Sequence, residues 1–218
     1  MRERIKSYFV FTSLGFRILA FAVAPVLLLL MGIFCTIVIG APGYLLIAFL
    51  LIPVEMLLDY INFGGMCAKN VSHLDYVKGS RKGEKIMKHA LIGNINRMFI
   101  SGAVLVAVNY LIFHLFYKEQ GVDRLMILLI LTVLLSAFGS TMLGIIIGRF
   151  FESMQLYSLL SIVGLGIEVL VMYLFSMKPY LTLTLSSIMA IGFSALSVVI
   201  AMKHIKESYY DETVTDGI

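Results

Sequence analysis

Six long apolar segments determine what this chain of 218 residues can fold into. They cover residues 18–39, 44–64, 98–116, 125–148, 156–176 and 180–202. Each is close to the roughly 20 residues that an α-helix needs to cross the hydrocarbon core of a bilayer. The short alternating strands of a membrane β-barrel are missing from the pattern, and a lipid-exposed helix satisfies its own backbone hydrogen bonds. We therefore predict an all-α membrane protein with six transmembrane helices.

The composition leaves no room for a soluble catalytic domain. Apolar residues make up 60% of the chain and charged residues 14%, whereas a soluble domain has about 45–50% and about 25%. The longest polar interval, between Met66 and Met98, is shorter than the roughly 50 residues of a small domain. Any soluble machinery that acts with this chain must come from a partner.

The distribution of lysine and arginine predicts the orientation. Most of the 17 basic residues fall in the N-terminal segment, in the second connection and in the C-terminal tail. The opposite side receives Lys118, Arg124 and Lys178. By the positive-inside rule, both termini and the second connection lie in the cytoplasm. The net charge of +4 is explained by this topology, so we expect no nucleic-acid partner.

The prediction divides the chain into three parts. Residues 1–17 form a basic amphipathic segment, 18–202 the six-helix domain with a cytoplasmic loop at 67–97, and 203–218 a cytoplasmic tail. In the first part, Ile5, Tyr8, Phe9 and Thr12 follow helical spacing, which favours a short helix lying on the inner membrane surface. The alternative is a disordered basic start.

Motifs for catalysis and metal binding are missing from the sequence. Neither HExxH nor GxSxG occurs, and the run Gly-Ser-Arg-Lys-Gly at 79–83 does not match a phosphate-binding loop. Cys35 and Cys67 lie in or beside apolar runs without metal-ligand spacing. We expect no enzymatic activity, cofactor or metal in this chain.

The loop at 67–97 is the longest connection, and long loops usually carry a function. Its second part, residues 84–97, has one apolar face formed by Ile86, Met87, Ala90, Leu91 and Ile95, which favours a cytoplasmic helix leading into the third span. The sequence around it reads DYIN at 59–62 and DYVKGSRKGEKI at 75–86. With two spans before it and four after it, this arrangement resembles the short six-helix membrane subunits of ATP-binding-cassette (ABC) exporters. It is nearest to the bacterial exporters of lantibiotics and phenol-soluble modulins. Here Val77-Lys78-Gly79 replaces a Leu-Pro-x turn of that family.

The resemblance implies a partner and a cargo. In that family the ATPase, with its ATP and Mg²⁺, is a separate chain that docks on this loop, and the membrane subunit pairs with a second one, either identical or similar. The implied function is export of a small peptide or amphipathic compound across the bacterial plasma membrane. The docking candidates are Asp75, Tyr76, Lys78, Arg81 and Lys82. The alternative is a solvated loop whose lysines only enforce the topology.

Three acidic residues inside the spans are candidates for the translocation path. Glu55 and Asp59 are one helical turn apart, and Glu168 lies near the middle of its span. An unpaired charge at this depth is costly, so each must pair, take up a proton or face a polar path. For Asp59 we favour pairing with Arg17 or Arg97. Glu55 and Glu168 either line a path for a cationic or amphipathic cargo or share a proton.

A stripe of small residues predicts close helix packing. Ser136, Ser140, Gly144 and Gly148 recur at every fourth position of the fourth span. Such a stripe lets a second backbone approach closely. It forms a seam either within this chain or between two copies.

Two other functions stay open at this point. One is the substrate-binding membrane subunit of a vitamin or metal uptake transporter, which also borrows an ATPase. The other is an assembly or immunity protein that transports nothing, for which Glu55 and Glu168 would be replaceable by glutamine.

Overall fold

The computed structural model describes residues 2–63, 82–117, 124–151 and 153–213, and within these ranges the chain is helical apart from short turns. Six helices are long and apolar enough to cross a membrane. They span Leu14–Ile39, Gly43–Phe63, Gly83–Phe116, Arg124–Arg149, Met154–Met177 and Pro179–Ile205. The prediction of six membrane-spanning helices is confirmed, and the chain is a multi-pass membrane protein.

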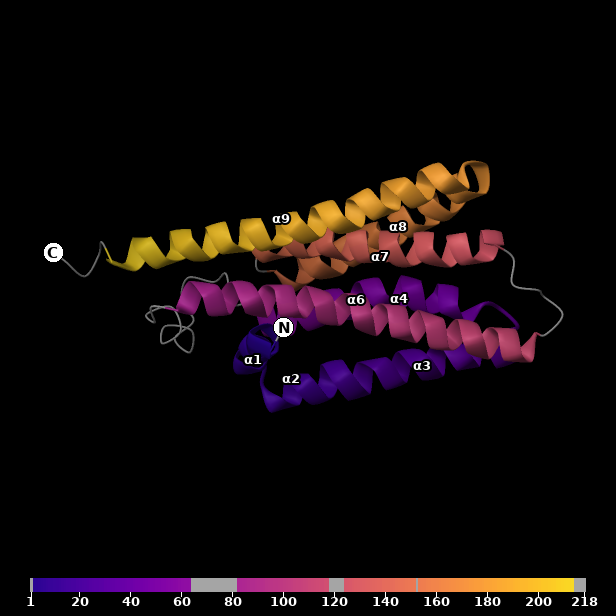
Figure 1. Ribbon diagram of the computed structural model, residues 1–218, viewed down its shortest axis with the longest axis horizontal. Coiled ribbons are helices and arrows are strands. Elements are labelled where there is room, and N and C mark those ends of the chain that lie inside the picture. The colour runs from indigo at the N-terminus through magenta and orange to yellow at the C-terminus, as the bar shows by residue number, and fades with distance from the viewer. Residues whose placement is uncertain (1, 64–81, 118–123, 152, 214–218) are drawn as a thin grey trace.

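The helices form one bundle (Figure 1). The elements in chain order are α1 (Arg2–Phe11), α2 (Leu14–Ile18), η1 (Leu19–Val23), α3 (Ala24–Phe34), η2 (Cys35–Ile39), α4 (Gly43–Phe63), α6 (Gly83–Phe116), α7 (Arg124–Phe151), α8 (Met154–Met177) and α9 (Pro179–Thr213). The second spanning helix, α4, contacts α3, α6, α7 and α8. Helix α7 packs in turn against α8 and α9. The contacts therefore centre on α4 and α7.

The first spanning helix is interrupted by two π-helical turns, η1 and η2. Pro25 lies at the start of α3, directly after η1. Proline has no backbone N–H, so it cannot continue the ordinary hydrogen-bond ladder, and a wider turn accommodates the missing bond. The helix ends at Gly40, whose φ of 73° is left-handed. Glycine adopts this conformation without a steric cost, which allows the short turn into α4.

The second half of the predicted loop is helical in the structure. Helix α6 runs without a break from Gly83 to Phe116, so the helix expected over residues 84–97 is continuous with the third spanning helix. Met87, Ala90 and Leu91 are buried in a core cluster. Their spacing continues one apolar face along the helix, which explains why the helix does not end at Met98.

Helix α1 packs against α6. Tyr8 and Phe16 are buried together with Leu58 and Phe63 of α4. The Arg17 guanidinium then closes the turn after α1, because its Nη2 lies 2.8 Å from the Thr12 carbonyl oxygen and its Cζ lies 4.8 Å from the Phe9 ring centroid. The predicted N-terminal helix is present, and its contacts join it to the bundle.

The basic side chains concentrate at one end of the bundle. Figure 1 shows α1, the beginning of α6 and the later part of α9 at the same end. The exposed lysines Lys82, Lys85, Lys88 and Lys203 come from the last two of these segments. The opposite end carries Arg124 and Lys178.

Candidate functional site

The candidate site begins on α4, where Glu55 and Asp59 are one helical turn apart and both are buried. Arg97 of α6 binds the Glu55 carboxylate through two nitrogens. Its Nη1 donates to Oε1 at 3.2 Å and its Nη2 to Oε2 at 2.5 Å. This bidentate geometry is the strongest form of an arginine–carboxylate contact.

Asp59 is paired in the same way with Arg149 of α7. The Arg149 Nε donates to Oδ2 at 3.0 Å and its Nη2 to Oδ1 at 2.6 Å. Asn94 of α6 bridges the two pairs, since its Nδ2 donates to Asp59 at 3.0 Å and its Oδ1 accepts from Arg97 at 3.3 Å. We call Glu55, Asp59, Asn94, Arg97 and Arg149 the charge network.

The charge network ties three helices together at the basic end of the bundle. Its members are between 0% and 7% exposed, and its two acids balance its two arginines. Removing charges from water is costly, so such a network persists only where every donor and acceptor geometry is good. Its five side chains therefore hold α4, α6 and α7 in a defined register.

The partners of Asp59 differ from the expected ones. Arg17, one of the two expected partners, instead binds the turn after α1. Arg97, the other, is occupied by Glu55, and Asp59 pairs with Arg149. Arg149 follows directly after the predicted fourth span, which ends at residue 148. The signal that could have identified the network is on α6, where Asn94 and Arg97 continue the apolar face of Leu91 and Met98.

Tyr8 of α1 lies at the edge of the charge network. The charges of Arg97 and Glu55 both act on its hydroxyl, which is buried without an oriented hydrogen bond. Burial raises the pKa of Tyr8 to about 12, and the positive charge of Arg97 partly opposes this. The hydroxyl is therefore neutral at physiological pH, and α1 covers the network without adding a charge.

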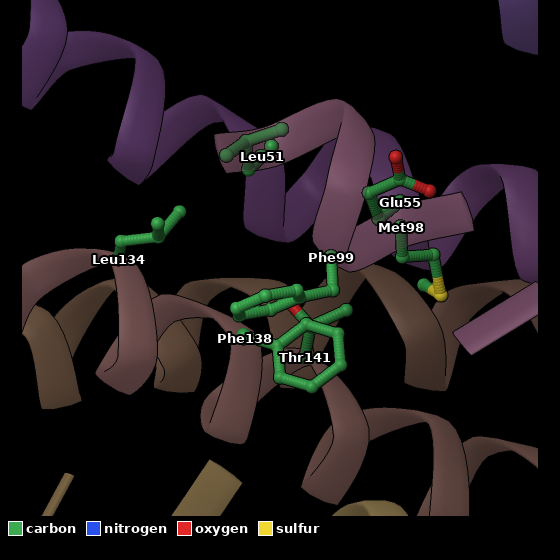
Figure 2. A pocket seen from close by; sticks show the side chains of 8 residues that line it. Leu51, Glu55, Met98, Phe99, Leu134, Phe138 and Thr141 are labelled. Atoms are coloured by element: carbon green, nitrogen blue, oxygen red, sulfur yellow. The ribbon is translucent and has the colours of Figure 1, made fainter. Parts of the chain in front are cut away.

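A small cavity adjoins Glu55 (Figure 2). Its volume is about 20 Å³, which is enough for one water molecule. Figure 2 shows the Phe99 and Phe138 rings beside Thr141, with Leu51 and Glu55 across the hollow. The cavity is too small for a cargo molecule.

Glu168 is in a different setting, in the middle of α8. It is fully buried, and the Ser136 hydroxyl of α7 donates to its Oε2 at 2.7 Å. Glu55 is bound to Arg97. The two acids therefore have separate partners, and the structure does not bring them into the shared-proton pair that was one of the expectations.

The stripe of small residues packs within this chain. Ser136 faces Glu168, and Ser140 is also buried. A Cβ atom on Gly144 would lie 2.5 Å from the Met56 side chain of α4, and one on Gly148 would lie 2.5 Å from the Tyr157 ring of α8. We expected this seam either within the chain or between two copies. The contacts that the structure describes lie within the chain.

Among the docking candidates the structure places Lys82, which is exposed directly before α6. Asp75, Tyr76, Lys78 and Arg81 lie outside the described residues. Within the described ranges, no three histidine, cysteine or acidic side chains gather as metal ligands.

Comparison of this chain with protein-family models, with curated proteins and with solved structures finds no match.

Proposed function

We propose that this chain is the membrane subunit of an ABC-type exporter, driven by separate ATPase subunits that dock on the segment between α4 and α6. The observation that carries the proposal is the charge network. It joins α4 and α6, the two helices that flank this segment, to α7 in the other half of the bundle. A displacement of the segment would therefore be transmitted to α4 and α6 and, through Arg149, to α7.

The network suits transmission of force better than contact with cargo. Both carboxylates already accept two hydrogen bonds from arginine, so a cationic cargo would have to displace a buried guanidinium. Packed elements that are joined in this way move as units rather than deforming continuously. We therefore assign Glu55 and Asp59 to the moving framework, while Glu168 remains a candidate for the translocation path.

The proposal includes an orientation and an assembly. The end with the exposed lysines faces the cytoplasm by the positive-inside rule, and the membrane is the plasma membrane of a bacterium. A second membrane subunit, identical or similar, completes the transporter. The cargo is a small peptide or amphipathic compound that leaves the cell. This part of the proposal is supported by the resemblance of the 59–86 segment to that exporter family.

Docking can be tested by purifying the tagged chain from its native membranes in mild detergent. We expect an ATPase to co-purify, detected by ATP photolabelling and by ATP turnover of the complex. Lys82→Glu should reduce the co-purified ATPase at least about tenfold, as expected for a hot-spot charge reversal. Lys178→Glu, the same change at the exposed opposite end, is the matched control and should have no effect. Equal co-purification by both variants, or ATP turnover by the isolated chain, would contradict the proposal.

Orientation can be tested by cysteine labelling. In a chain with Cys35 and Cys67 replaced by serine, Lys82→Cys and Lys178→Cys are exposed to a membrane-impermeant maleimide on intact cells. We expect position 178 to react and position 82 to react only after the cells are opened. The reverse pattern would place the docking segment outside the cell.

A further inference from the structure

Among the buried acids that the structure describes, Glu55 and Asp59 are paired with arginines and Glu168 is not. Its Oε2 accepts the Ser136 hydroxyl at 2.7 Å, but its Oε1 makes no hydrogen bond. The Ser140 hydroxyl, one turn along α7 from Ser136, is close enough to influence the same carboxyl and also lacks an oriented partner. Glu168 Oε1 on α8 and the Ser140 hydroxyl on α7 thus lie on opposite sides of the α7–α8 contact without an oriented hydrogen bond.

The charged groups around this seam are engaged elsewhere or lie at the helix ends. Within the described residues, the oriented side-chain contact of the Glu168 carboxyl is the one from Ser136, and the carboxyl is fully buried. The ionisable side chains described on α8 and on the helices packed against it are Tyr44, Glu55, Asp59, Tyr60, Arg124, Arg149, Tyr157, Tyr173, Tyr180, Lys203 and His204. Of these, Glu55 and Asp59 are held by arginines, so neither is free to bind Glu168.

A proton completes the hydrogen bonding of this cluster. A carboxylate in an apolar interior needs a cation or several donors, whereas a neutral carboxyl needs one donor and one acceptor. Ser136 supplies the donor to Oε2, and Ser140 offers an acceptor for a proton on Oε1. We infer that Glu168, Ser136 and Ser140 form a proton-binding site in the middle of the membrane, at which Glu168 carries a proton at neutral pH.

The seam around this site is closed. Gly164 lies one turn before Glu168 on α8, and a Cβ atom there would lie 2.9 Å from Ile52 and 3.7 Å from Ser140. Close packing at this position excludes water from the carboxyl. The proton is therefore exchanged when α7 and α8 separate, and opening of the seam and release of the proton are one event. This inference does not depend on an ATPase partner.

Infrared spectroscopy of the purified full-length chain in lipid vesicles tests the site directly. We expect the C=O stretching band of a protonated carboxyl at pH 7 in the wild type and its loss in Glu168→Gln. Glu84→Gln, the same change at an exposed acid, is the control and should keep the band. A wild type without the band, or a band that survives Glu168→Gln, would overturn the inference.

Two further arms test the partners and the closed seam. Ser136→Ala and Ser140→Ala should each move the band to higher frequency, because each removes a hydrogen bond from the carboxyl; a band unmoved by both would overturn the assignment of the partners. In heavy water the band should shift slowly in the wild type and at least tenfold faster in Gly164→Ala. An immediate shift in the wild type would overturn the closed seam.

Discussion

Glu55 and Glu168 are glutamates buried in the same bundle, but their hydrogen-bond partners differ. Glu55 lies in the charge network at the basic end, where Arg97 takes both of its oxygens. Glu168 lies in the middle of α8, where its one oriented partner is a serine. The difference follows from the neighbouring side chains, because arginines from two helices reach Glu55 and Asp59, whereas a serine hydroxyl reaches Glu168. A buried acid is thus defined by its partners, and these determine whether an ion pair or a proton neutralises it.

The largest effect that separates the two regions is expected from Arg97→Met. The variant leaves Glu55 as a buried carboxylate without its cation, which costs about 3–5 kcal/mol of unfolding free energy. The measurement is unfolding by SDS titration in mixed micelles. The double variant Glu55→Gln/Arg97→Met removes both charges and should recover most of this loss. If Arg97→Met were as stable as the wild type, the network would not hold the helices together.

Gly164→Ala should have the next largest effect and acts on the other region. The new Cβ atom meets Ile52 at 2.9 Å, and over-packing of this kind costs about 1–3 kcal/mol. Gly166→Ala is the matched control on the same helix, since a Cβ atom there meets nothing within 4 Å. The same SDS titration compares them. Equal stabilities would contradict the close contact between α4 and α8.

Ser136→Ala should cost about 1 kcal/mol, the net contribution of one buried hydrogen bond. The lost bond is the 2.7 Å contact to Glu168. Ser158→Ala, which removes an exposed hydroxyl bonded to its own helix, should cost less. A loss for Ser136→Ala as large as that for Arg97→Met would indicate that Glu168 is charged and depends on this donor.

Glu168→Gln should have a small effect on stability, about 1 kcal/mol or less, because the amide keeps one acceptor and one donor of the protonated carboxyl and leaves only its second N–H unpaired. Glu55→Gln, the same change in the charge network, should be clearly less stable, since it leaves Arg97 without a carboxylate. Thermal unfolding in detergent followed by size-exclusion chromatography compares the two. Equal losses of stability in the two variants would contradict the difference between the charge network and the Glu168 site.

The spans could be predicted from the sequence because an apolar run of sufficient length has few other structures open to it. The six helices accordingly begin and end close to the expected residues, except that α6 starts at Gly83 rather than near Met98. That Glu55 and Asp59 need partners was equally predictable, because a charge in a bundle interior must be compensated.

The identity of those partners could not be predicted in the same way. Arg149 is 90 residues from Asp59 in the sequence, and its pairing depends on how α7 is rotated and placed against α4. Asn94 and Arg97 lie on the helix expected over residues 84–97, but the sequence does not show which carboxylates of α4 that helix faces. The contact of Ser136 with Glu168 likewise depends on the packing of α7 against α8.

Helix α6 is longer than a membrane is thick. With 34 residues and a rise of 1.5 Å per residue, it measures about 50 Å, whereas the hydrocarbon core measures about 30 Å. Roughly 20 Å of uninterrupted helix therefore stands clear of the lipid tails at the lysine-bearing end. Met87, Ala90 and Leu91 of this part of α6 are buried in one cluster with Tyr8 of α1 and Met202 of α9, so a force applied to the projecting helix would pass directly to its neighbours.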